Sequence, residues 1–140
     1  MVRVFLDTNF LLDLALEHRP GGKAAAEILQ RAEEGELAGI VSPSSLKDFY
    51  YIARKDMPDD LRRGWIAFFM DGFAVADTNR SVCQNALVSD EPDFEDGIVR
   101  AIAEDEGCDY ILTRDAKGFD GSKAPKIEPE ELSVFATEKR

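Results

Sequence analysis

Two aspartates stand at the ends of apolar segments that the sequence predicts to be buried strands. Asp7 comes directly after Val2–Leu6, and Asp115 follows Tyr110–Thr113. Ligands bind open α/β sheets just beyond the carboxyl ends of the strands, so we expect the fold to bring both carboxylates to one edge. Gathered carboxylates disfavour one another's ionisation unless a cation is present, and Mg²⁺ and Mn²⁺ prefer carboxylate oxygens. The pattern therefore indicates a divalent-metal site that serves phosphoryl chemistry.

Each of these aspartates also has an ordinary structural interpretation. Asp7 could cap the helix predicted to begin near Asn9, although Thr8 and Asn9 could supply that cap themselves. Asp115 could form the backbone hydrogen bonds of a turn within residues 113–118. We favour a place in the site for both residues.

A third acidic segment lies at the predicted start of a helix. Asp93 suits the N-cap, and Asp96, three residues later, would complete a capping box. Acids also suit a helix N-terminus electrostatically, which is a sufficient structural reason for them. Helical periodicity does not choose between Glu95 and Asp96 as the residue that faces a site.

Asp48 is a fourth acid, within a predicted helix. It projects almost opposite the expected core face, which is formed by Leu46, Phe49, Tyr50 and Ala53. Asp48 therefore either faces solvent or lines a cleft. Tyr51 and Ile52, which lie on the same side as Asp48, favour the cleft.

The elements that must position these acids alternate between short apolar strands and amphipathic helices. The predicted strands are Val2–Leu6, Ala38–Val41, Phe73–Ala76, Tyr110–Thr113 and a short Lys126–Ile127. The predicted helices cover residues 9–17, 25–34, 43–55, 81–88 and 93–106, with two more that begin at Pro58-Asp59 and at Pro129. In the helix after Pro58, one face holds Leu61, Trp65, Phe68 and Phe69, and the segment Trp65–Met70 is predicted to be core. This alternation is typical of a parallel α/β sheet covered by helices on both faces.

Composition sets the class of the protein. The 140 residues, 44% of them hydrophobic, fit a single domain over residues 1–140. We expect a cytoplasmic protein with no membrane association, because the sequence has no secretory signal or membrane-spanning stretch. Cys83 and Cys108 lack metal-ligand spacing and are expected to be reduced. The formal net charge of −11 and the scattered basic residues count against nucleic-acid binding.

Several other kinds of catalytic site are excluded because the sequence lacks the residues that they need. A serine or cysteine triad lacks a base, because the one histidine, His18, stands beside a Pro-Gly turn and is expected on the surface. The sequence has no Gly-rich phosphate loop, zinc-ligand spacing or dinucleotide fingerprint. A phosphatase of the HAD type also begins at a strand-end aspartate, but it needs a second acid two residues later, where this chain has Asn9.

The acidic segments together resemble a PIN domain, in particular the VapC-type toxin ribonucleases of bacterial toxin–antitoxin pairs. The segments that resemble the four family motifs are Val4–Asn9 with Leu11–Asp13, residues 40–51, residues 93–103 and Thr113–Asp115. The family's acids fall on Asp7, Asp48, Asp96 and Asp115, and Asp48 stands where the family usually has glutamate. The matching segments span about residues 2–119, in order and at family-like spacing.

This resemblance implies a fold and an activity. The fold is a single PIN-like α/β domain with a five-stranded parallel sheet and helices on both faces. The activity is cleavage of an RNA substrate that depends on Mg²⁺ or Mn²⁺, with metal held by Asp7, Asp96 and Asp115 and with Asp48 completing the set. Asn9 and Thr113 would orient ligands or water, and Asp93 is grouped with them as a supporting residue. Frequent homodimers and a cognate antitoxin that blocks the site are also implied.

Two hypotheses follow from the sequence. The leading one is a metal-dependent endoribonuclease in which water attacks a phosphodiester in line, acting as the toxin of a toxin–antitoxin pair. The alternative is a catalytically weak PIN-like module that acts by binding a protein partner. The acidity of the chain and the aspartate at position 48 favour the alternative.

Overall fold

One five-stranded parallel sheet organises the molecule, which we describe from a computed structural model covering residues 1–138. The strands are β1 (Val2–Leu6), β2 (Leu37–Val41), β3 (Ala74–Val75), β4 (Tyr110–Leu112) and β5 (Lys126–Ile127), in the spatial order β3-β2-β1-β4-β5. The central strand, β1, pairs with both β2 and β4, and Leu6 lies opposite Leu112 in the second pairing. The residues that follow β1 and β4 therefore emerge side by side at one edge of the sheet, as predicted.

The helices also follow the predicted order. They are α1 (Thr8–Ala15), α2 (Gly22–Glu33), α3 (Pro43–Ile52) with the 3-10 turn η1 (Ala53–Lys55), α4 (Asp59–Gly72), α5 (Arg80–Val88), α6 (Phe94–Asp105) and α7 (Pro129–Glu138). Local signals set several of these boundaries. Ser42 accepts a hydrogen bond from the Ser45 N–H and so caps α3, whose first residue is a proline. Gly35, at φ 81°, follows the end of α2, in a conformation that glycine adopts without strain.

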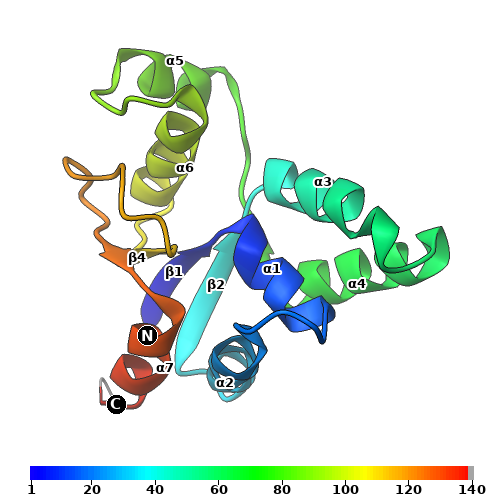
Figure 1. The fold of residues 1–140 in the computed structure, drawn as a ribbon. Helices are drawn as coiled ribbons and strands as arrows, with labels where there is room; N and C mark the ends of the chain where they lie inside the picture. Colours follow the sequence, from blue (N-terminus) through cyan, green and yellow to red (C-terminus); the bar gives the residue numbers. More distant parts are fainter. Residues whose placement is uncertain (139–140) are drawn as a thin grey trace.

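The sheet separates two apolar cores because neighbouring residues of a strand point to opposite faces. Val4 and Leu6 belong to the larger core, together with residues of α1, α2, α3, α4 and α7. Phe5 belongs to the smaller core, together with residues of α5 and α6. Figure 1 shows the same division, with α5 and α6 on one side of β1 and β2 and with α1, α2 and α7 on the other. Helices thus cover both faces, as predicted.

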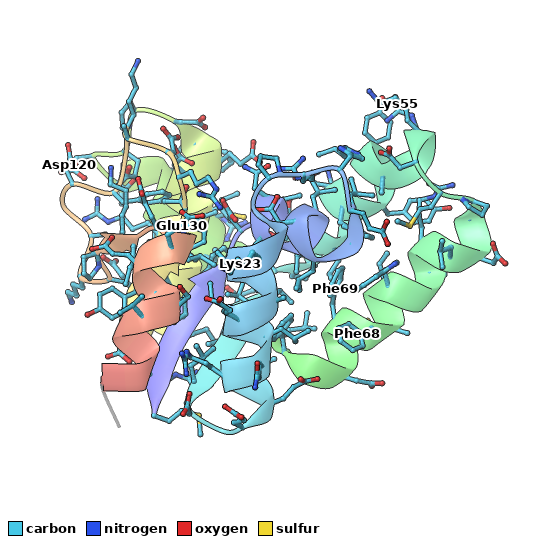
Figure 2. All side chains as sticks on the ribbon, turned by 60° about the horizontal axis from the view of Figure 1, so that its bottom comes forward. Lys23, Lys55, Phe68, Phe69, Asp120 and Glu130 are labelled. Carbon is cyan, nitrogen blue, oxygen red and sulfur yellow. The ribbon has the colours of Figure 1, made fainter. Side chains whose placement is uncertain are left out.

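The predicted core face of α4 is buried only in part. Phe69 is fully buried and packs edge-on against Phe49, with ring centroids 5.0 Å apart. Phe68 and Met70, which lie in the segment predicted to be core, are 39% and 53% exposed. Figure 2 shows Phe69 between α4 and the body of the protein. The prediction was wrong for Phe68 and Met70, because no described element covers these side chains.

The structure describes no helix long and apolar enough to cross a membrane. Cys83 is exposed, Cys108 is buried, and both are free thiols. His18 is exposed, as predicted, with its Nε2 atom 3.2 Å from a carboxylate oxygen of Asp56.

Glycine at position 39 is required by the packing above the strand that leads to Asp7. A Cβ at Gly39 would lie 2.6 Å from the Leu6 side chain and 2.7 Å from the ring of Phe73. We expect Gly39→Ala to lower the free energy of unfolding by about 1–3 kcal/mol, because both neighbours are buried and must move. Urea denaturation followed by circular dichroism measures this change.

Gly64→Ala is the matched control. Gly64 lies in α4 with open space around the position of a Cβ, so the same added methyl group should raise helix stability by up to about 1 kcal/mol. Equal effects of the two substitutions would contradict the packing argument.

Candidate functional site

A cavity of about 520 Å³ opens at the carboxyl edge of the sheet, where β1, β2 and β4 end. It brings together six of the seven residues singled out from the sequence: Asp7, Asn9, Asp48, Asp96, Thr113 and Asp115. The seventh, Asp93, caps α6 and is not among the lining residues. The fold thus gathers on one cavity four acids that are more than a hundred residues apart at the extremes of the sequence.

Asp7 is held at the end of β1 by the start of α1. It is the N-cap of α1, and its Oδ1 atom accepts a hydrogen bond of 3.0 Å from the Phe10 N–H. The expectation that Thr8 or Asn9 would supply this cap was wrong, because the helix already begins at Thr8. Capping and facing the cavity are therefore compatible: one carboxylate does both.

Burial makes the charge of Asp7 unfavourable. Loss of hydration raises its pKa to about 6, against the lowering effect of the Phe10 N–H. The nearby negative charge of Asp13 raises the pKa further, whereas the positive charges of Arg114 and Arg19 lower it. Near neutral pH the site therefore holds a carboxylate that a cation would stabilise.

Asp96 faces the cavity from the first turn of α6. The N-cap of this helix is Asp93, as predicted, and its side chain accepts a hydrogen bond of 2.8 Å from the Glu95 N–H. A reciprocal bond from Asp96, which a capping box requires, is absent from the described structure. Burial raises the pKa of Asp96, and the negative charges of Asp93, Asp115 and Glu91 raise it further. Glu95 lines the same cavity, so the structure leaves both acids facing the site.

Asp115 and Asp48 complete the acidic lining from opposite sides. The Asp115 carboxylate accepts a hydrogen bond of 3.0 Å from the Lys117 N–H, and its own N–H donates to the Thr113 hydroxyl at 3.1 Å. Asp115 therefore forms the backbone hydrogen bonds of the turn and also lines the cavity. Asp48 lines the cavity from α3, which confirms the cleft that the sequence favoured, and its carboxylate is 3.0 Å from the Lys47 ammonium group.

Asn9 is oriented by an ion pair between Arg19 and the buried Asp13, which was not predicted from the sequence. The Nε atom of Arg19 donates to Asp13 at 2.7 Å, and an Nη atom donates to the Asn9 amide oxygen at 3.1 Å. Arginine has no acceptor, so the bond to Arg19 fixes which end of the Asn9 amide is its oxygen and leaves the NH₂ group as a donor. Asp13 is only 6% exposed. Its position within the apolar run Phe10–Leu14 is the feature of the sequence that could have indicated a buried acid.

A second buried acid, Glu91, holds the loop after Asp115. One carboxylate oxygen accepts a hydrogen bond of 2.8 Å from the Phe119 N–H, and the other accepts one of 3.0 Å from Arg100. Its side chain is 2% exposed. Gly118, at φ 86°, lies against the site, since a Cβ there would be 3.2 Å from a carboxylate oxygen of Asp96. No local signal in the sequence distinguishes Glu91 from the many surface acids.

The donor set fits a hard divalent cation in chemistry. The cavity offers five carboxylates, those of the four aspartates and Glu95, together with hydroxyl and amide groups. Two of them, Asp7 and Asp96, have raised pKa values that a bound cation would lower. Among the described residues, no three His, Cys, Asp or Glu side chains are close enough together to bind one ion as they stand. Side-chain rotation and water ligands would complete such a site, as is usual for Mg²⁺.

Comparisons with known proteins agree with this architecture. The family model for the PIN domain matches residues 3–117, whereas no curated protein matches the sequence. VapBC2 from Rickettsia felis, bound to a DNA fragment from its promoter, shares 13% identity at a TM-score of 0.63, over 91% of this chain and 98% of that one.

Two further solved structures are similar. VapC20 from Mycobacterium tuberculosis, a toxin that cleaves the sarcin–ricin loop, shares 15% identity at a TM-score of 0.60, over 77% of this chain and 86% of that one. FitAB bound to an IR36 DNA fragment shares 15% identity at a TM-score of 0.63, over 90% of this chain and 94% of that one. At these identities the likeness shows a common fold.

The buried charge of Asp7 predicts a stability that depends on pH. Its pKa is about 6 in the folded protein and near 3.8 when unfolded, so stability falls as the pH rises through this window. An asparagine at position 7 can still cap α1 but carries no charge. We expect metal-free Asp7→Asn to unfold at a higher free energy than the wild type at pH 7.5, by up to roughly 3 kcal/mol, with no difference near pH 3.5.

Urea denaturation in EDTA at both pH values measures this difference. Asp120→Asn is the matched control, because Asp120 is exposed in the loop before β5 (Figure 2) and should show no such gain. A loss of stability in Asp7→Asn at pH 7.5 would show that the ionised carboxylate is stabilising after all.

Proposed function

Because the chain belongs to the PIN domain family, we propose that it is a metal-dependent endoribonuclease and the toxin of a toxin–antitoxin pair. The observation that supports this most directly is the cavity in which Asp7, Asp48, Asp96 and Asp115 meet. RNA as substrate is supported by the likeness in fold to VapC20, a toxin that cleaves the sarcin–ricin loop.

In this proposal Asp7, Asp96 and Asp115 hold Mg²⁺ or Mn²⁺, and Asp48 completes the set. The bound ion would supply an activated water and neutralise charge on the phosphodiester. The residues of the chain fix the geometry: the α1 cap holds Asp7, and the Thr113 hydroxyl accepts from the backbone of Asp115. Hydrolysis then breaks one P–O bond and adds water across it.

Asn9 has a separate role in the proposal. Since Arg19 occupies its amide oxygen, the NH₂ group of Asn9 can donate to a phosphate oxygen or to water at the cavity. The Asp13–Arg19 pair favours this orientation, because the planar arginine fork is bonded at two points, to the buried Asp13 and to Asn9.

The partners in this proposal are a cognate antitoxin and a second copy of the chain, in the cytoplasm. The likeness in fold to chains of VapBC2 and FitAB supports the antitoxin. Apolar side chains that α4 leaves exposed, including Leu61, Phe68 and Met70, are of the kind that partner interfaces cover.

The alternative is a catalytically weak PIN module that acts through a protein partner. Asp48 favours it, because this short acid replaces the usual glutamate and is already paired with Lys47. A metal titration separates the two functions. Mn²⁺ bound only to the folded state must stabilise it, by about 2.7 kcal/mol at a hundred times the dissociation constant.

We expect millimolar Mn²⁺ to raise the melting temperature of the wild type and to leave Asp7→Asn unchanged, because that variant lacks a charged ligand. Differential scanning fluorimetry measures both. A wild type that shows no shift would favour the partner-binding module, and an equal shift in both proteins would place the ion elsewhere.

The cleavage prediction is graded by residue. Asp7→Asn, Asp96→Asn and Asp115→Asn should each reduce cleavage of a mixed RNA pool to the level of an EDTA control, whereas Asp48→Asn should leave a measurable rate. Gel analysis with Mn²⁺, Mg²⁺ or EDTA tests this, and circular dichroism checks the fold. Full activity in Asp7→Asn would falsify the proposed mechanism.

Arg19→Lys tests the orientation of Asn9. A lysine keeps the charge beside Asp13 but cannot bond both Asp13 and Asn9 through a planar fork. We expect cleavage to fall about tenfold or more with little change in melting temperature, because small misplacements of a positioned group are costly. Asn9→Ala in the same assay should lose as much, and adding Arg19→Lys to it should cost nothing further.

A further inference from the structure

A basic and aromatic stripe runs along α3 beside the cavity. Lys47, Tyr51 and Arg54 stand at intervals of four and three residues, so they occupy one side of the helix and its continuation into η1. The adjacent side of the same helix holds Asp48 and Ile52, which line the cavity. We call Lys47, Tyr51 and Arg54 the α3 stripe. Basic residues are scattered along the sequence, Arg54 among them.

The aromatic part of the stripe is exposed and already ordered. The Arg54 guanidinium carbon lies 3.7 Å from the centroid of the Tyr51 ring, and an Nη atom donates to the Tyr51 carbonyl oxygen at 2.7 Å. Tyr51 nevertheless remains 61% exposed. The contact holds a cation over the ring while most of the Tyr51 side chain stays in solvent.

The charge of Arg54 differs from the charges of Arg19 and Arg114 in its availability to a ligand. Arg19 is bonded to Asp13, and Arg114 is bonded to Glu130 at 2.6 Å. Arg54 has no carboxylate partner among the described residues. Lys47 uses one of its three donors on Asp48 at the mouth of the cavity.

We propose that the α3 stripe binds single-stranded RNA as it enters the cavity, with a nucleobase stacked on Tyr51 and with phosphates on Arg54 and Lys47. An exposed aromatic ring flanked by cations is how proteins bind single strands with little regard to sequence. In a chain of net charge −11, the exposed Arg54, which has no carboxylate partner among the described residues, also marks a place where a polyanion can approach. This inference rests on the proposed ribonuclease function and deepens it.

The stripe leads outward from the cavity. Lys47 and Tyr51 are next in sequence to Asp48 and Ile52, which line the cavity, whereas Lys55 in η1 projects into solvent (Figure 2). A strand laid along the stripe would therefore pass the cavity that the acids line.

The test measures binding of fluorescently labelled oligouridylate by anisotropy, with Asp7→Asn as the parent so that the probe stays intact. We expect Tyr51→Ala to weaken binding about tenfold or more, because a stacked base is lost. Tyr51→Phe, which keeps the ring, should bind like the parent. Equal binding by Tyr51→Ala and the parent, or no binding by the parent, would overturn the inference.

The salt dependence of binding tests the cations. Arg54→Ala should reduce the slope of log K against log salt by about 0.7, the contribution of one phosphate contact on a single strand. Lys123→Ala is the control for lost charge, because Lys123 is exposed beside Glu104, toward the far end of α6 from Asp96. If Lys123→Ala lowers the slope as much as Arg54→Ala, binding is nonspecific attraction and the stripe is not a site.

Two further measurements separate this inference from the proposed function. Metal-dependent cleavage by the wild type, together with unchanged binding by Tyr51→Ala, would keep the function and overturn the stripe. Binding that depends on Tyr51 without any cleavage would keep the stripe as an RNA site and reject the nuclease. If poly-glutamate binds as tightly as the RNA and loses as much on Tyr51→Ala, the stripe serves an acidic protein segment, which also overturns the inference.

Discussion

The structure depends on one unfavourable charge at the end of its central strand. Asp7 follows β1, which is paired on both sides, so the sheet fixes its backbone and the α1 cap fixes its side chain. Burial there raises its pKa, and the positive charges of Arg19 and Arg114 only partly offset the effect. Those two arginines are held in turn by the buried Asp13. The ion-pair network beneath the cavity thus supports a carboxylate that the fold alone would prefer uncharged.

The elements that sequence could predict are those with local causes. Ser42 and Asp93 cap their helices as expected, because a cap is decided by a few neighbouring residues. The side chains that sequence could not place depend on contacts between distant segments. Glu91 bonds the backbone at Phe119 across 28 residues, and α4 leaves Phe68 exposed because nothing described packs over it. Amphipathic periodicity identifies an apolar face but not the element that covers it.

The four acids differ in how firmly the fold holds them. Asp7 and Asp115 accept backbone hydrogen bonds, whereas Asp96 has no such partner in the described structure and Asp48 is paired with a flexible lysine. The backbone therefore holds the two acids beside the strand ends more firmly than the two on α3 and α6. In the proposed metal site, an ion held by the first two acids would be completed by the other two, and rotation of the Asp48 side chain would let a shorter acid take part.

Net charge describes this surface poorly because Arg19 and Arg114, two cations near the site, form ion pairs within the protein. Arg19 and Arg114 stabilise buried or neighbouring acids, so they contribute little to the field that an approaching polyanion meets. Arg54, which stacks on Tyr51, keeps its charge in solvent. Exposed charges farther apart than about 10 Å are largely screened at moderate ionic strength. In the proposed function, the acids elsewhere on the chain would therefore repel RNA only weakly at the α3 stripe, where the charge of Arg54 would act despite a total of −11.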